Sequence, residues 1–145
     1  MPSIFSRIID GELPGRFVWQ DEVCAAFLSI NPSTDGHTLV VSREEVDRWT
    51  DAPAELVTHL MTVARTIGVA QQEEWECPRV GLLIQGYEIP HLHVHVWPTF
   101  SARDFDPRQI QINPDPAVLD SSAQRLRARL RTLGHGDHVP ADPAR

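Results

Sequence analysis

Three histidines at alternating positions are the residues of this chain with the clearest capacity for chemistry. Residues 91–95 read His-Leu-His-Val-His. Successive side chains of a β-strand point to opposite faces, so a strand would place His91, His93 and His95 on one face. A helix would spread the three imidazoles over about 200°, at ~100° per residue. The spacing therefore predicts a strand that presents three imidazoles to one site.

Imidazole chemistry leaves three interpretations of this strand open, because neutral imidazole is a nucleophile, a general base and a metal ligand near pH 7. In the first, the histidines form a polar sheet face with hydrogen-bonded rings. In the second, they bind zinc with a third ligand such as His37 or Glu88. In the third, one imidazole is a catalytic nucleophile, and its neighbours position it and tune its pKa.

Short apolar runs bounded by turn residues predict the sheet that would position these histidines. The links between most of these runs are too short for a parallel crossover, so antiparallel pairing is expected. The predicted strands are residues 16–20, 23–30, 37–42, 79–85 and 91–97.

Two further segments have apolar residues at helical spacing. The first begins near Asp51, is weakened at Gly68 and ends before Cys77-Pro78, because proline cannot continue a helix. The second runs from about Pro116 to Gly134. It carries four arginines that are expected to be solvated: Arg125, Arg127, Arg129 and Arg131. The whole pattern predicts an α+β domain with a five-stranded antiparallel sheet and two helices.

Length and composition fit a single globular domain. The chain has 145 residues, of which 41% are hydrophobic and 23% charged, as is usual for such domains. The domain is predicted to span residues 1–133, with the motif region at 4–98 and a loop and the C-terminal helix at 99–133. Residues 134–145 are expected to form a flexible tail.

Charge and cysteine content narrow the partners and the compartment. The formal net charge of −7 argues against nucleic acid and acidic membranes as partners, although it allows a small anionic ligand. Cys24 and Cys77 are far apart in apolar contexts, which indicates reduced thiols. The sequence has neither an apolar run of about 18 residues nor a basic-then-apolar leader, so a cytoplasmic location is expected.

The sequence resembles the histidine triad (HIT) superfamily, whose signature is His-φ-His-φ-His-φ-φ with φ apolar. Residues 91–97 match the signature fully, and residues 4–14 and 26–41 are similar to the opening segment and to the strands that carry the ribose site and a fourth histidine. The resemblance implies five antiparallel strands with two helices, and a homodimer whose sheets join into one. Apolar residues that would suit the interface are Leu82, Leu83 and Ile84.

This resemblance implies nucleotide hydrolase or transferase activity without a cofactor or a catalytic metal. His93 would attack the α-phosphorus of a nucleoside 5′-phosphate ester, anhydride or phosphoramidate, and water or another acceptor would then release the nucleotide from the histidine. The backbone carbonyl of His91 would fix the tautomer of His93, and His95 would contact the phosphate or the leaving group. His37 would complete the imidazole cluster. The apolar residues expected to line the base pocket are Phe5, Ile8, Phe27 and Ile30.

The chain departs from the family pattern at positions that bear on the substrate. Ser29 stands where an aspartate commonly accepts the two ribose hydroxyls, and Tyr87 and Glu88 replace a Gln-Ser pair that contacts phosphate or leaving group. A carboxylate and a phosphate ~4 Å apart repel by roughly 1 to 4 kcal/mol, depending on the effective dielectric. Two explanations of Glu88 are open. In the first, Glu88 is protonated, or hydrogen-bonded to His91 or His37, and acts as a general acid or an orienting group. In the second, the protein binds a ligand that has a different shape or carries less charge.

Two alternatives to the covalent enzyme remain at this point. A nucleotide-binding or regulatory module with weak or lost catalysis would explain the departures at Ser29, Tyr87 and Glu88. The second alternative is a metal-dependent hydrolase that uses the histidine cluster. Structural zinc is not expected, because Ser6 and Ile9 stand where many bacterial relatives carry cysteines.

Overall fold

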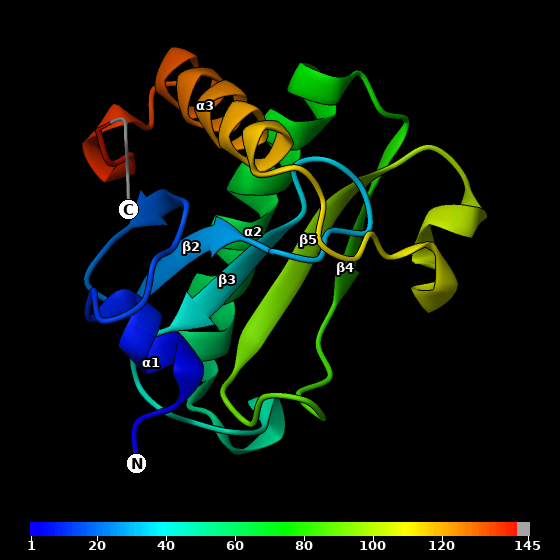
Figure 1. The fold of residues 1–145 in the computed structure, drawn as a ribbon. Helices are drawn as coiled ribbons and strands as arrows, with labels where there is room; N and C mark the ends of the chain where they lie inside the picture. The colour runs from blue at the N-terminus through cyan, green and yellow to red at the C-terminus, as the bar shows by residue number, and fades with distance from the viewer. Residues whose placement is uncertain (142–145) are drawn as a thin grey trace.

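A computed structural model describes residues 1–141 and shows one sheet with helices against it (Figure 1). All five strands pair antiparallel in the order β1-β2-β3-β5-β4, so the predicted sheet is confirmed. The strands are β1 (Phe17–Gln20), β2 (Cys24–Leu28), β3 (Thr38–Ser42), β4 (Arg79–Leu83) and β5 (His93–Thr99). The helices are α1 (Ile4–Ile9), α2 (Ala54–Trp75) and α3 (Pro116–Thr132).

The two faces of the sheet have different surroundings. Cys24, Ala26 and Leu28 of β2 point to a core shared with α2 and α3. The alternating residues Ala25 and Phe27 point to the opposite face, where a smaller apolar cluster includes α1. The period of two therefore separates one fully covered face from one that is only partly covered by α1.

Helix α2 continues well past the predicted weak point at Gly68. A Cβ at this position would lie 3.3 Å from Cγ1 of Val80, which is tighter than most real contacts. Gly68 therefore permits a close approach of the helix to β4, and tertiary packing outweighs its low helix propensity. The helix ends at Trp75, and its C-cap Glu76 has a left-handed φ of 52°, directly before Cys77-Pro78 as predicted.

The arginine-rich helix α3 is less solvated than its sequence indicates. Arg127 is only 4% exposed, and its Nε donates a hydrogen bond to the carbonyl of Phe17 at 2.7 Å. Arg125 and Arg129 form ion pairs with Glu74 of α2. The prediction of a solvated side chain was wrong for Arg127, because alternate positions spread around a helix and one of them faces the sheet.

The structure adds short elements that the sequence did not predict. Helix α1 lies in the opening segment, and the loop predicted before the C-terminal helix contains the 3₁₀ turns Ala102–Phe105 and Pro107–Gln109. In the predicted flexible tail, Gly136–His138 forms a 3₁₀ turn, and the ring of His138 stacks on Trp19 with centroids 4.6 Å apart. The rest of that tail, residues 142–145, lies outside the described residues. None of the described helices is long and apolar enough to cross a membrane.

Candidate active site

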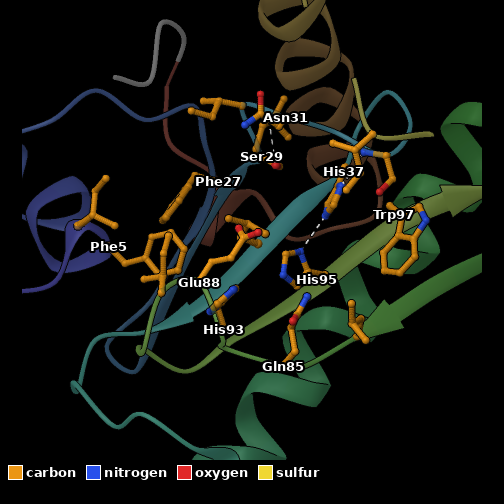
Figure 2. Close-up of a pocket in the computed structure, with 18 of the residues that line it drawn as sticks. Phe5, Phe27, Ser29, Asn31, His37, Gln85, Glu88, His93, His95 and Trp97 are labelled. Atoms are coloured by element: carbon orange, nitrogen blue, oxygen red, sulfur yellow. Dashed lines mark hydrogen bonds between the residues drawn. The ribbon is translucent and has the colours of Figure 1, made fainter. Parts of the chain in front are cut away.

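A cavity of about 790 Å³ opens on the partly covered face of the sheet, beside α1 (Figure 2). His93 and His95 project into it from β5, and His37 enters from the residue before β3. Of the predicted binding residues, six line the cavity: Phe5, Ile8, Phe27, Ser29, Ile30 and Glu88. Tyr87 is 93% exposed and does not line it.

His93 has one ring nitrogen fixed and one free. Its Nδ1 lies 2.6 Å from the carbonyl oxygen of His91, and because a carbonyl only accepts, Nδ1 carries the proton. The other nitrogen, Nε2, makes no hydrogen bond within residues 1–141. The ring of Phe5 packs edge-on against the imidazole, with centroids 4.8 Å apart. The result is an oriented imidazole with a free lone pair at the cavity.

A chain of hydrogen bonds sets the tautomers of His37 and His95. The backbone N–H of Ser33 donates to Nδ1 of His37 at 2.9 Å, so the proton of a neutral His37 ring is on Nε2. That nitrogen lies 3.0 Å from Nδ1 of His95, which must then accept (Figure 2). The proton of His95 is therefore on Nε2, which remains available to donate to a ligand.

Burial keeps these imidazoles neutral at pH 7. Loss of solvation is the largest cause of each shift: it lowers the pKa of His37 to about 3 and of His95 to about 4, and neighbouring histidines add to both. The pKa of His93 also falls below its usual value through burial, although its hydrogen bond to the His91 carbonyl and the Glu88 charge oppose the fall. A neutral ring is what a nucleophile requires.

His91 differs from the other members of the motif, because β5 begins at His93 and His91 precedes the strand. Its ring is fully buried and does not line the cavity. Nε2 donates to the carbonyl of Ser42 at 2.6 Å, and Nδ1 accepts from the hydroxyl of Ser3. His91 thus holds its own carbonyl beneath His93 and is a positioning residue in this geometry.

The start of α1 supports His91 from the outside. Ser3 is the N-cap of the helix, and its Oγ accepts from the backbone N–H of Ser6. The carboxylate of Glu45 accepts hydrogen bonds from the backbone N–H of Ser3 and from the hydroxyl of Ser6. Neither Ser3 nor Glu45 was predicted from the sequence, although a serine before an apolar turn is itself a capping signal.

The turn before His37 is held by close contacts with α2. Gly36 has a φ of +90°, and a Cβ there would lie 2.7 Å from the ring of Trp75, so only glycine fits. The buried amide of Gln71 donates to the carbonyls of Gly36 and Val96 at 2.9 and 3.0 Å. One side chain of α2 therefore ties together the segments that carry His37 and His95.

Glu88 extends into the cavity between the aromatic rings and the histidines (Figure 2). The suggested hydrogen bond from Glu88 to His91 or His37 is wrong, because both ring nitrogens of each histidine already have other partners. Its charge acts on His93 instead, whose pKa it raises.

Ser29 lies at the other end of the cavity, where its Oγ accepts a hydrogen bond from the backbone N–H of Asn31 at 3.3 Å.

Several lining residues were not predicted from the sequence. Gln85 and Asn31 add amide groups near the histidines and Ser29 respectively (Figure 2). Trp97, the last residue of the histidine signature, also lines the cavity. Other lining residues come from segments distant in sequence: Arg16, Phe105, Arg108, Ile110 and Ile112. Gln85 and Asn31 stand next to predicted positions and were detectable, whereas the 105–112 segment carries no local signal.

The buried neutral imidazoles predict a loss of stability in mild acid. In the unfolded chain, histidines take up protons near pH 6.5. In the folded protein, the lowered pKa values of His37 and His95 keep these rings neutral until about pH 3 and pH 4 respectively. The unfolded state thus binds more protons in this window, so the stabilisation present above pH 6.5 is lost as pH falls towards 4, at up to ~1.4 kcal/mol per pH unit per fully buried group. Urea unfolding across this range measures the slope. A double variant, His37→Gln with His95→Gln, is expected to flatten it, and an unchanged slope would contradict the assignment.

The comparisons with known proteins agree with this architecture. A model of the HIT domain matches residues 10–102. An uncharacterized HIT-like protein of Methanocaldococcus jannaschii is 35% identical over 101 residues, which cover 67% of this chain and 78% of that protein. An uncharacterized HIT-like protein of Saccharolobus solfataricus is 30% identical over 118 residues, covering 74% of this chain and 85% of that protein.

Solved structures extend the similarity to nearly the whole fold. A zinc-bound histidine triad family protein from Mycobacterium smegmatis superposes with a TM-score of 0.78 at 28% identity, covering 94% of this chain and 98% of that one. A hypothetical histidine triad nucleotide-binding protein from Sulfolobus tokodaii also has a TM-score of 0.78, at 26% identity, with 89% and 92% covered. The alternating histidines, the sheet that carries them and the matched domain model have one explanation: the chain belongs to the HIT domain family.

Proposed function

We propose that this protein is a nucleotidyl hydrolase or transferase that cleaves a nucleoside 5′-phosphate ester, anhydride or phosphoramidate. Nε2 of His93 attacks the α-phosphorus, and the bond from phosphorus to the leaving group breaks as the phosphorus–nitrogen bond forms. Water or another acceptor then attacks the nucleotidyl-histidine, and the nucleotide leaves with His93 neutral again. Nε2–H of His95 donates to the phosphate or the leaving atom, where charge develops.

The free Nε2 of His93 is the observation that carries this proposal. The ring is neutral, oriented through Nδ1 and placed at the wall of a cavity, which are the requirements for nucleophilic catalysis. The metal-dependent alternative has less support, since the one group of three metal-ligating side chains that converges in the described part of the chain lies elsewhere. The ring contacts of Phe5 and Phe27 give the same cavity an apolar wall that suits a base.

Trapping of the intermediate tests the proposal. The protein is incubated with an adenosine 5′-phosphoramidate, quenched, and examined by intact-mass spectrometry. A transient increase equal to one adenylyl group on the wild type, absent in His93→Ala, is the expected result. Binding of the nucleotide without any adduct or turnover would favour the nucleotide-binding module instead.

Glu88→Gln is expected to change the pH dependence of turnover more than it changes nucleotide affinity. The Glu88 charge raises the pKa of His93 against the effect of burial, so its removal moves the acid limb of kcat/KM to lower pH. Rate profiles and the Kd for the product nucleotide are measured side by side. Glu55→Gln, an exposed carboxylate on α2 outside the cavity, is the matched control. An unchanged profile would contradict the role of Glu88.

We also propose that the chain forms a homodimer in which two copies join at β4. This strand is the edge of the sheet, and its Leu82 and Leu83 are each 43% exposed. An exposed apolar edge favours pairing with a second strand. Leu82→Glu is expected to give monomers by size exclusion with light scattering. Val118→Glu, at a 39% exposed position of α3, is expected to leave the dimer intact. A monomeric wild type would refute this assembly.

A further inference from the structure

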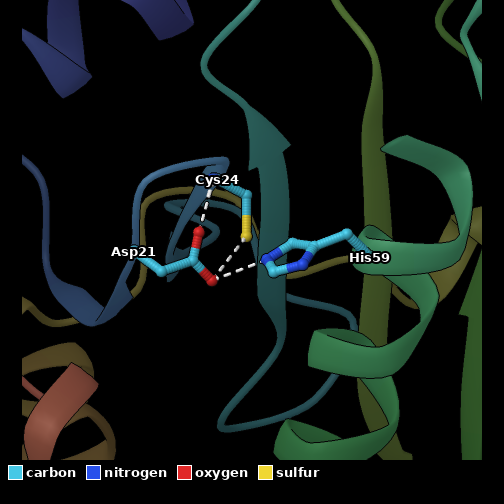
Figure 3. Close-up of side chains that lie close together, drawn as sticks. All are labelled: Asp21, Cys24 and His59. Atoms are coloured by element: carbon cyan, nitrogen blue, oxygen red, sulfur yellow. Dashed lines mark hydrogen bonds and ion pairs between the residues drawn. The ribbon is translucent and has the colours of Figure 1, made fainter. Parts of the chain in front are cut away.

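A second cluster of chemically competent side chains lies away from the histidine site. Asp21 is in the turn between β1 and β2, Cys24 begins β2, and His59 comes from α2 (Figure 3). Cys24 points to the core shared with α2, on the sheet face opposite the cavity. None of the three residues lines the cavity, so the proposed nucleotide chemistry does not use them.

The three side chains converge on one carboxylate oxygen. Oδ2 of Asp21 lies 2.7 Å from Nε2 of His59 and 3.6 Å from Sγ of Cys24 (Figure 3). The three potential ligand atoms all lie within 4.8 Å of one another. Ligands of a tetrahedral zinc ion lie about 2.0–2.3 Å from the metal and therefore roughly 3.3–3.7 Å from one another. The separation of Asp21 and Cys24 already fits this range, whereas the 2.7 Å pair of Asp21 and His59 must open to admit the ion.

The carboxylate is held in place by groups that leave the cluster open. Oδ1 of Asp21 accepts the backbone N–H groups of Val23 and Cys24, each at 2.8 Å, and Oδ2 also accepts Nε1–H of Trp19 at 2.8 Å. Burial alone would raise the pKa of Asp21, but the hydrogen bonds from Trp19, Cys24, His59 and Val23 hold it well below its usual range. Such supporting bonds are typical of the partners that orient metal ligands.

Burial and access differ across the cluster in a way that suits an ion entering from solvent. Cys24 is fully buried, the side chain of Asp21 is 9% exposed, and that of His59 is 37% exposed. Cys24 and Asp21 therefore approach the cluster from the protein interior, and the side at His59 is open to solvent. An ion held by these three side chains would take its fourth ligand, a water, from this open side.

We propose that Asp21, Cys24 and His59 bind one divalent transition-metal ion of the zinc class. Binding breaks the S–H bond of Cys24 and releases that proton to solvent. His59 gives up the hydrogen on Nε2 and coordinates through that nitrogen, with the ring proton on Nδ1. The ion thus takes the place of the hydrogens of Cys24 and His59 that now point at Oδ2, while the N–H of Trp19 continues to donate to this oxygen. Thiolate and imidazole ligands select this class over magnesium and calcium, which prefer oxygen.

A bound ion would fix the β1–β2 turn to the middle of α2. In the structure, the hydrogen bond between Asp21 and His59 makes this connection, together with the apolar packing of Val23 and Cys24 against the core that includes α2. Metal binding to the folded state alone also raises thermal stability by mass action. We therefore expect the ion to stabilise the fold, and this effect can be measured separately from turnover at His93.

Cobalt titration of the reduced full chain tests the assignment. One Co²⁺ per chain is expected to give the sulfur-to-cobalt charge-transfer band together with the intense visible bands of a tetrahedral site. Sulfur absorption separates this cluster from the histidine cavity, which has no cysteine in its lining. Zinc is expected to displace cobalt and to raise the melting temperature.

Two variants and one matched control complete the test. Cys24→Ser is expected to abolish the charge-transfer band, and His59→Gln to weaken cobalt affinity at least about tenfold. The side chain of His59 is partly exposed, so His59→Gln is expected to stay folded and tests the site even if Cys24→Ser unfolds the protein. Cys77→Ser, at the other buried free cysteine, is expected to behave as wild type. Absence of the band at saturating cobalt, its loss in Cys77→Ser, or unchanged affinity in His59→Gln would each overturn the proposal.

Discussion

Replacement of His93 by alanine is expected to abolish the nucleotidyl adduct and to lower kcat by about 10⁴-fold or more, a loss typical of a missing catalytic nucleophile. The reason is geometric. Nε2 of His93 is the free nitrogen of a ring whose other nitrogen is fixed by the carbonyl of His91, and His95 has no such backbone anchor. Single-turnover kinetics with an adenosine 5′-phosphoramidate measure the loss.

Chemical rescue separates loss of the nucleophile from loss of structure. His93→Gly leaves a space beside Phe5, and added imidazole is expected to restore part of the turnover in this variant. The wild type should not respond. Product formation by His93→Ala at a rate close to that of the wild type would place the nucleophile elsewhere and refute the mechanism.

Replacement of His95 by alanine is expected to lower kcat by about 10²–10³-fold with a smaller change in KM. The lost group is a preorganised donor aimed at developing negative charge, and losses of this size are typical when one such donor is removed. His37 delivers its Nε2–H to Nδ1 of His95, so the proton of His95 stays on the nitrogen that faces the ligand. Steady-state kinetics with phosphoramidate and anhydride substrates measure the effect.

An asparagine at the same position is the matched variant. The amide of His95→Asn has both an acceptor for the His37 proton and a donor for the ligand, so it is expected to recover part of the rate lost in His95→Ala. Equal activity of the alanine and asparagine variants would show that the hydrogen-bond chain from Ser33 through His37 does not act on catalysis.

Local pattern accounts for most of the fold. Short apolar runs between turn residues predicted four of the five strands, alternation predicted the strand that carries the histidines, and helical spacing predicted α2 and α3. The differences have tertiary causes. Gly68 remains helical because α2 packs closely on Val80, and Arg127 is buried because it bonds to the carbonyl of Phe17.

Most of the residues that the sequence placed at the site line the cavity, including Phe5 and Phe27, which are far from the histidine motif in sequence. His93, His95 and His37 come together at the cavity as the sequence predicted. Tyr87 was placed at the site by its neighbours in sequence, but its ring points to solvent. The Asp21–Cys24–His59 cluster was not detected, since His59 comes from α2 and no motif connects it to the β1–β2 turn.

The sequence by itself determined the family, the antiparallel sheet and the identity of the imidazoles, because side-chain alternation and the histidine spacing are local properties. Only the tertiary structure decided which nitrogen is free. That outcome depends on the partners of the other ring nitrogens. Ser33 donates to His37 and Ser3 donates to His91, whereas the carbonyls of Ser42 and His91 accept from His91 and His93. Proton positions follow from partners in space, and residue spacing alone does not supply those partners.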